Sequence, residues 1–226
     1  LKEQEKLTPE LEKEVMKAEN MARLEDIYLP YKPKRKTRAS MAREKGLESL
    51  AKKLLEQNGF DVEGEAAKYI NEEKGVADIE SALQGARDII AETINENAEL
   101  RDRMRRLFNR TATIKSRVMP GKEEAAQKYK DYFDWEENLA KSPSHRVLAM
   151  RRGEAEMLLM LDILPKEDEA VALMDKQFLK ASGEVGQQMK LAIRDCYKRL
   201  LSPSMETEVR MTSKKKADTE AIDVFA

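Results

Sequence analysis

The side chains that most enzymes use for metal binding or nucleophilic catalysis are nearly missing from this chain. Its 226 residues include one histidine, His145, and one cysteine, Cys196. The chain therefore has few side chains for a histidine-based metal cluster or a nucleophilic triad, and an internal disulfide cannot form. The sequence also contains no HExxH, Walker loop or GxGxxG. We expect a protein that is not an enzyme and that binds neither a metal nor another cofactor.

Glycine and aromatic residues are scarce as well. Nine glycines and 5% aromatic residues are few for the many turns and β-branched runs of a sandwich or barrel. The chain is 41% hydrophobic and 38% charged, which is typical of solvated helices. The composition predicts an all-α protein, an irregular assembly of helices with at most a short strand or hairpin.

No apolar run approaches the roughly 20 residues that cross a bilayer, and the charged N-terminus lacks the apolar core of a signal peptide. Cys196 lies among apolar helix positions, which suits a reducing compartment. We expect a soluble cytoplasmic protein. The chain begins without methionine, and its last residues lack a helix stop signal, so we also expect a fragment of a longer protein.

The most informative segment is the basic arm, residues 24–38, in which two prolines precede or interrupt a run of cations. Pro30 and Pro33 disfavour a helix and predict extended geometry at Leu29 and Lys32. The candidate phosphate contacts are Lys32, Lys34, Arg35, Lys36 and Arg38. The candidate base-stacking residues are Tyr28 and Tyr31.

The charge of this arm allows two interpretations. From Tyr28 to Arg43 there are six basic residues and no acidic one, in a chain whose net charge is −1. A charged loop that keeps the surface solvated is the usual role of a bare lysine run. Nucleic-acid contacts, in contrast, combine cations with aromatic faces on which bases stack, and the tyrosines favour this second interpretation.

A second group of cations follows an acidic stretch. Residues 63–99 contain ten acidic and three basic residues, whereas residues 101–117 contain seven basic residues and one acidic residue. Helical periodicity places the apolar residues of the second stretch on a core side and its arginines outward. The candidate phosphate contacts here are Arg101, Arg103, Arg105 and Arg106.

Capping residues predict several helix starts, at Thr37 or Ser40, at Asp78 and at Asn97. Between the first two helices after the arm, the Ala42-x-x-x-Gly46 spacing is typical of a helix-turn-helix, in which a small residue and a turn glycine let two helices cross closely. Ordinary helix packing explains this spacing as well. Residues 48–52 also lack the Asn, Gln or Arg that reads base edges.

The second half of the chain alternates between helix and strand signals. Residues 111–120 favour extended structure, so we predict a linker there and a helix that resumes at Lys122. The aromatic residues 129–135 predict core packing near the end of that helix. The apolar run 156–164 fits a buried strand or a buried helix, and we favour the helix.

We expect two regions, residues 1–118 with the basic arm and residues 119–226 with further helices. Four sequence blocks within them carry a resemblance to a known family. They are LEDIYLPYKPKRKTR (24–38), ALQGARDIIAE (82–92), SPSHRVLAMRRGE (142–154) and YKRLLSPSMETEVR (197–210). Over nearly its whole length, the chain resembles the bacterial Tex family of transcription accessory proteins.

This resemblance implies a place within a multidomain protein. Tex proteins have a helical N-terminal region, a ribonuclease-H-like domain, helix-hairpin-helix elements and an OB-fold RNA-binding domain. The blocks place this chain in the N-terminal region, before the ribonuclease-H-like domain. The resemblance implies contact with RNA or DNA and with RNA polymerase, and no catalytic residue of the family maps onto this chain.

Two hypotheses follow. In the first, the chain is a non-enzymatic region whose basic surfaces contact phosphates without sequence preference. In the second, it is a pure helical scaffold or protein-interaction module, in which the same cations pair with the acidic residues of 63–99. A nuclease would need converging carboxylates, which the sequence does not indicate.

Overall fold

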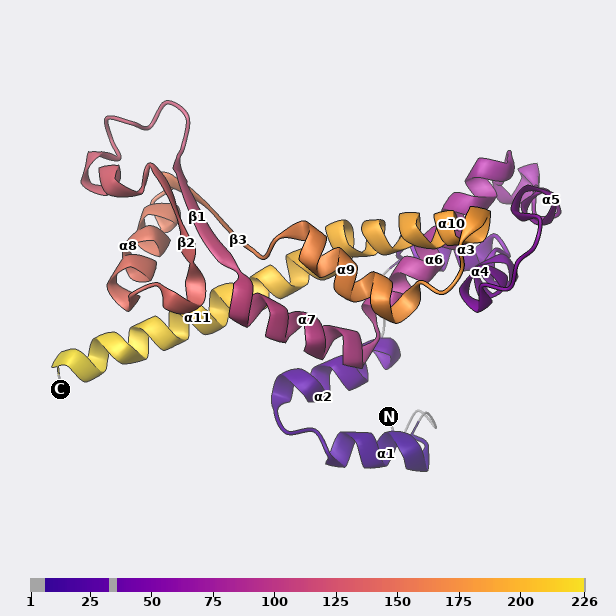
Figure 1. The fold of residues 1–226 in the computed structure, drawn as a ribbon, viewed down its shortest axis with the longest axis horizontal. Coiled ribbons are helices and arrows are strands. Elements are labelled where there is room, and N and C mark those ends of the chain that lie inside the picture. The colour runs from indigo at the N-terminus through magenta and orange to yellow at the C-terminus, as the bar shows by residue number, and fades with distance from the viewer. Residues whose placement is uncertain (1–6, 33–35, 226) are drawn as a thin grey trace. The chain divides into compact units, whose positions relative to one another are not determined.

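The computed structural model describes residues 7–32 and 36–225, and it confirms a mainly helical fold (Figure 1). In chain order, the α-helices of this part are α1 (Pro9–Met16), α2 (Met21–Tyr28), α3 (Arg38–Glu44), α4 (Glu48–Glu56), α5 (Val62–Ala67), α6 (Ile79–Asn95), α7 (Ala98–Thr111), α8 (Ser144–Ala155), α9 (Glu167–Phe178), α10 (Gly183–Asp195) and α11 (Ser202–Phe225). The 3-10 helices are η1 (Leu29–Tyr31), η2 (Glu72–Lys74), η3 (Gln127–Tyr132) and η4 (Leu139–Lys141), and η5 (Cys196–Leu201) is a π-helix. The strands are β1 (Thr113–Val118), β2 (Asp134–Asn138) and β3 (Leu159–Leu164).

The helix starts follow from the local sequence. The Asp78 carboxylate accepts a hydrogen bond from the backbone N–H of Ser81 at 2.7 Å and so caps α6. Thr37 caps α3 by accepting from the N–H of Ser40 at 3.0 Å. Asn97 accepts from the N–H of Leu100 at 2.8 Å at the start of α7. These caps are confirmed, because each needs only residues three positions apart.

The chain forms two compact units, and each unit combines two segments of the sequence. Unit 1 consists of residues 1–102 and 171–201, and unit 2 consists of residues 103–170 and 202–226. The regions expected from the sequence, 1–118 and 119–226, are contiguous and stay a prediction. Among the described residues, no helix is both long enough and apolar enough to cross a membrane.

Helix α6 is central to unit 1. Helices α3, α4, α5 and α10 all pack against it, and Figure 1 shows α6 running alongside α10. The apolar side of α6 is buried because Ala82, Ala86, Ile90 and Ile94 recur at helical spacing and are at most 1% exposed. Burial of a large aliphatic side chain contributes about 1.5–3 kcal/mol to stability, so this helix anchors the unit.

The spacing that resembles a helix-turn-helix serves close packing. Helix α3 ends before Gly46, whose φ of +85° lies in the region that favours glycine. A Cβ added at Gly85 of α6 would lie 2.3 Å from Leu47 Cδ1 and 3.3 Å from Ala42 Cβ. The small residues therefore let α3 and the turn after it approach α6. The packing interpretation explains the spacing, and the helix-turn-helix stays an untested alternative.

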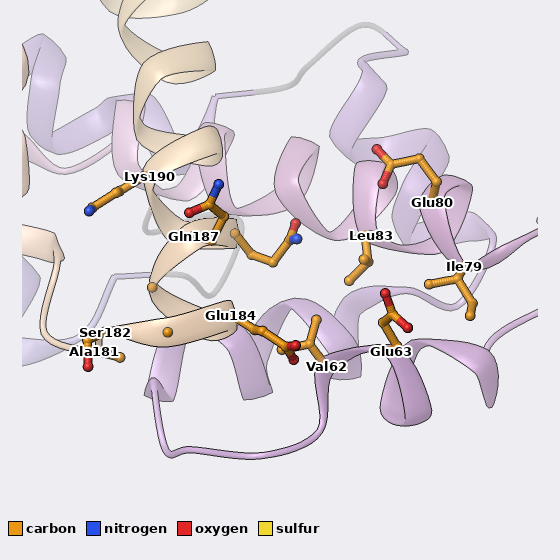
Figure 2. A pocket seen from close by; sticks show the side chains of 13 residues that line it. Val62, Glu63, Ile79, Glu80, Leu83, Ala181, Ser182, Glu184, Gln187 and Lys190 are labelled. Atoms are coloured by element: carbon orange, nitrogen blue, oxygen red, sulfur yellow. The ribbon is translucent and has the colours of Figure 1, made fainter.

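Unit 1 also contains a groove between α5, α6 and the start of α10 (Figure 2). It has a volume of about 750 Å³. Val62 and Leu83 form an apolar floor and are at most 4% exposed. Glu63 and Glu184 stand at its rim and are exposed.

Unit 2 is built on an antiparallel sheet with the strand order β2-β1-β3. Ser116 of β1 lies opposite Trp135 of β2 and Leu161 of β3. Inward-facing residues alternate along β3, where Leu159, Leu161 and Ile163 are buried. Helices α8 and α11 pack against β3 and against each other.

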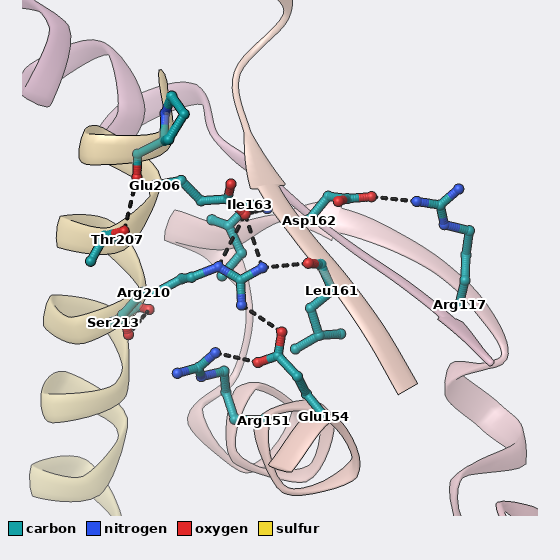
Figure 3. A network of polar contacts seen from close by, with 11 residues as sticks. Arg117, Arg151, Glu154, Leu161, Asp162, Ile163, Glu206, Thr207, Arg210 and Ser213 are labelled. Carbon is teal, nitrogen blue, oxygen red and sulfur yellow. Dashed lines mark hydrogen bonds and ion pairs between the residues drawn. The ribbon is translucent and has the colours of Figure 1, made fainter. Parts of the chain in front are cut away.

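Side chains of α11 satisfy backbone groups along β3 (Figure 3). The backbone N–H of Ile163 donates to Glu206 Oε1 at 2.9 Å, and Arg210 donates to the carbonyl oxygen of Leu161. Arg210 also donates to Glu206 Oε1 at 2.9 Å and to Glu154 Oε1 of α8 at 2.6 Å. One arginine thereby connects β3, α8 and α11.

The sheet corrects three predictions for the second half of the chain. The predicted linker at 111–120 contains β1, which pairs on both sides. The helix predicted from Lys122 is wrong, because the segment forms turns, η3 and β2. The run 156–164 contains β3 rather than a helix. Strand pairing turns the extended segment 111–120 into β1 and overrides the local helix signal of the other two segments.

Candidate nucleic-acid interface

The basic arm leaves α2 through a 3-10 turn. Leu29 has φ −51° and ψ −43°, so the prediction that it is extended is wrong. Pro30 lies at the start of η1, where its missing N–H costs no hydrogen bond. Lys32 has ψ 133° and is extended, as the following proline predicts. Two predicted contacts, Lys34 and Arg35, lie outside the described residues.

The described cations of the arm face solvent. Lys32, Lys36 and Arg38 are all exposed. Lys36 Nζ lies 3.7 Å from Glu44 Oε2, and the two side chains are 68% and 65% exposed. Such a solvated pair contributes roughly 0–1 kcal/mol and restrains the lysine little. The two candidate stacking residues, Tyr28 and Tyr31, are half-buried.

The end of the arm is fixed to the core of unit 1. The Thr37 hydroxyl donates to Glu92 Oε1 at 3.0 Å, and Arg43 Nη1 donates to Glu92 Oε2 at 2.6 Å. Glu92 lies on α6 and is only 8% exposed. Because a partly buried, charge-assisted hydrogen bond is stronger than a surface pair, α3 holds the arm's last cations in a defined place.

The arginines of α7 do not form one outward surface. Arg101 is 6% exposed, and its Nε donates to Asp26 Oδ1 of α2 at 2.6 Å. Its predicted outward orientation is therefore wrong. Arg105 is half-buried and donates to Glu208 of α11 at 2.7 Å. Arg103 and Arg106 are exposed, as predicted.

Other arginines, which the sequence does not single out, form internal ion pairs. Arg87 of α6 is 5% exposed and contacts Glu80, Gln84 and Gln188. Arg199 of η5 pairs with Asp195 and with Asp88 of α6 at 3.2 Å. Burial raises the pKa of Asp88, and Arg199 opposes that rise. Only the i,i+4 spacing of Asp195 and Arg199 could have been recognised in the sequence.

The single cysteine and the single histidine lie in different units. Cys196 is buried, and burial raises the pKa of its thiol to about 12. His145 is exposed at the start of α8. Within the described residues, no group of three or more His, Cys, Asp or Glu is placed to hold a metal ion.

The aromatic cluster predicted to pack in the core lies in unit 2. Tyr129 is 6% exposed. The rings of Tyr132 and Trp135 meet edge to face, with their centroids 6.1 Å apart. Arg146 lies 5.2 Å from the centroid of the Trp135 ring. These contacts are typical of packing within the fold, as the sequence predicts.

A family model and several known proteins match this chain over most or all of its length. Residues 57–225 match a family model described as Tex central region-like. The protein YhgF of Escherichia coli is 39% identical over 236 residues, which cover 100% of this chain and 30% of YhgF. Protein tex of Bordetella pertussis is 37% identical over 238 residues, covering 99% of this chain and 30% of that protein. Transcriptional accessory protein Tex of Neisseria gonorrhoeae is 37% identical over 234 residues, with coverage of 100% and 30%. The chain thus spans less than a third of the length of these relatives.

Proposed function

This chain belongs to the Tex family, and on that premise we propose that it is a non-enzymatic region of a cytoplasmic transcription accessory protein. In this proposal, the basic arm contacts the phosphates of RNA or DNA without sequence preference, and the helical core holds the arm in place.

The observation that carries the proposal is the contrast between the cations of the arm and three arginines that pair inside unit 1. Lys32, Lys36 and Arg38 are exposed, and among the described residues their one ion pair is the loose contact of Lys36 with Glu44. Arg87, Arg101 and Arg199, in contrast, pair with carboxylates inside unit 1. Phosphate contact needs cations that can exchange water and counterions for phosphate oxygens.

The structure also fixes the end of the arm. Thr37 caps α3 and donates to Glu92. A segment that is already held in place at one end loses less entropy on binding. Tyr28 and Tyr31 are half-buried, and in this proposal they stack on unpaired bases, which is tolerant of sequence.

A second candidate function is a scaffold that contacts RNA polymerase or the remaining domains and binds no nucleic acid itself. Internal ion pairs favour a scaffold, but two of the α7 pairs use Asp26 and Glu208 rather than the acidic residues of 63–99. Arg101 and Arg105, two of the four predicted contacts on α7, hold α2 and α11 in place. Such pairs fix the geometry of helices rather than attract an external anion.

The test uses three charge reversals, Lys32→Glu, Lys36→Glu and Arg38→Glu, in one variant. Binding of a single-stranded RNA and of a DNA duplex, each of mixed sequence, is measured by fluorescence anisotropy over a range of salt concentrations. If all three side chains meet phosphates, the slope of log K against log salt should fall by about 2–3 in magnitude.

The matched control reverses three exposed lysines of unit 2, Lys122, Lys130 and Lys166, and so changes the net charge equally. The control should retain most of the affinity and the salt slope. Equal losses in both variants would indicate non-specific attraction to net charge. Unchanged binding in the arm variant would favour the scaffold.

A further inference from the structure

The groove of unit 1 combines an apolar floor with carboxylates at its rim. Val62 of α5 and Leu83 of α6 line the floor, and Ile79 is partly exposed beside them. Figure 2 shows the Glu63 and Glu184 side chains on either side of Val62. The volume of about 750 Å³ is in the range of ligand sites, so a peptide side chain with its neighbours fits.

The two carboxylates differ from the other acidic residue of the groove. Glu80 forms an ion pair with the buried Arg87, so the charge of Glu80 is neutralised within the fold. Glu63 and Glu184 have no ion pair among the described residues, and both are exposed. Lys190 is the one basic side chain among those that line the groove. Glu63 and Glu184 against Lys190 leave the groove with one excess negative charge next to apolar surface.

The start of α10 adds hydrogen-bond donors to this surface. Ser182 is the N-cap, but its side chain makes no capping hydrogen bond. The first N–H groups of a helix have no partner within it, so they are available to a backbone carbonyl of a bound segment. Gly186 keeps the preceding turn close, because a Cβ there would lie 2.3 Å from the Ala181 carbonyl oxygen.

We propose that this groove binds an extended segment of a partner protein in which a lysine or arginine lies next to an apolar residue. The apolar residue and the aliphatic stem of the cation pack on Ile79, beside the floor of Val62 and Leu83, while the cationic group lies between Glu63 and Glu184. Charge complementarity selects this partner, since the same carboxylates repel the phosphates of nucleic acid. The proposal goes beyond the phosphate contact of the basic arm and does not depend on it.

The probe is a fluorescein-labelled peptide, Gly-Leu-Lys-Arg-Leu-Gly, titrated with the 226-residue chain and followed by anisotropy. The double substitution Glu63→Gln and Glu184→Gln should weaken binding about tenfold, since two exposed ion pairs with the peptide are lost. The matched control, Glu72→Gln with Glu73→Gln, removes two exposed carboxylates of η2 outside the groove and should change affinity less than about twofold. Circular dichroism of both variants checks that the helices are retained.

Changes in the probe test the apolar part without altering the protein. Serine in place of both leucines should weaken binding at least about tenfold, because the peptide then has no apolar side chain to bury in the groove. Glutamate in place of the lysine and arginine should abolish binding. The triple reversal in the basic arm should leave peptide binding intact, which separates this proposal from the proposed function.

Several results would overturn the proposal. They are no detectable binding of the probe, equal affinity in the groove variant and its control, or binding of the acidic peptide. Binding of inorganic phosphate at the start of α10, detected by competition with the probe, would also overturn it and would indicate an anion site.

Discussion

Replacing Arg101 by methionine should destabilise unit 1 more than the loss of any exposed charge. The Arg101 and Asp26 side chains are 7% and 4% exposed, and Nε and Oδ1 lie 2.6 Å apart. Methionine keeps much of the length of the side chain but leaves the Asp26 carboxylate buried without its arginine. Breaking a buried ion pair in this way costs about 3–5 kcal/mol, because the buried carboxylate loses the positive charge that offsets its desolvation.

The expected change in melting temperature follows from the size of the chain. For a protein of 150–250 residues, 1 kcal/mol shifts Tm by about 2–4 °C, so the loss should be roughly 6–20 °C. The double variant Asp26→Leu with Arg101→Met should recover most of this loss, since no buried charge remains. The control Lys36→Met removes a cation that is 68% exposed and should cost less than about 1 kcal/mol.

Urea titration followed by far-ultraviolet circular dichroism measures these differences in the free energy of unfolding. A loss below about 1 kcal/mol for Arg101→Met would refute the structural role of the pair. If that small loss came with weakened nucleic-acid binding, Arg101 would be a phosphate contact after all, as its place in the basic stretch predicts.

Two further predictions concern Arg210 and Cys196. Arg210→Met should lower the free energy of unfolding by about 1–3 kcal/mol in urea titrations, because the charge-assisted hydrogen bonds of Arg210 to Glu154 and Leu161 are lost. The control Arg117→Met removes an exposed ion pair and should cost less than about 1 kcal/mol. Cys196 should react with a maleimide only at the rate of unfolding, and fast labelling of the native chain would contradict its burial. Burial raises the pKa of this thiol from 9.0 to about 12. Its contribution to stability is therefore fully present below pH 9 and should be lost as the pH rises toward 12. The Cys196→Ala variant should not show this loss of stability at high pH.

The features that the sequence predicts correctly are local ones. Asp78 caps α6 and Gly46 ends the turn after α3, because each depends on a few neighbouring residues. The buried face of α6 follows from apolar residues at helical spacing. The solvent exposure of Lys32 and Lys36 also agrees with the unbroken charge of the arm.

The features that the sequence misses depend on distant partners. Residues 159–164 form a strand because β1, more than 40 residues earlier, pairs with them, and local periodicity contains no information about that pairing. Arg101 is inward because Asp26, 75 residues away in sequence, lies opposite it. The groove between α5 and α10 could not be predicted either, since its two carboxylates are separated by more than a hundred residues.

The interleaving of the two units has a consequence for synthesis on the ribosome. Unit 1 needs residues 171–201, including the buried Met189 and Ile193 of α10, and these leave the ribosome only after residues 103–170. At 5–20 residues per second, this delay is roughly 3–14 s. During this delay, the apolar face of α6 is not covered by α10, and unit 2 is incomplete until α11 has been synthesised. The nascent chain therefore exposes two incomplete cores at once, and we expect chaperones to bind it during translation. For the same reason, we expect chains truncated near residue 170 to be poorly soluble.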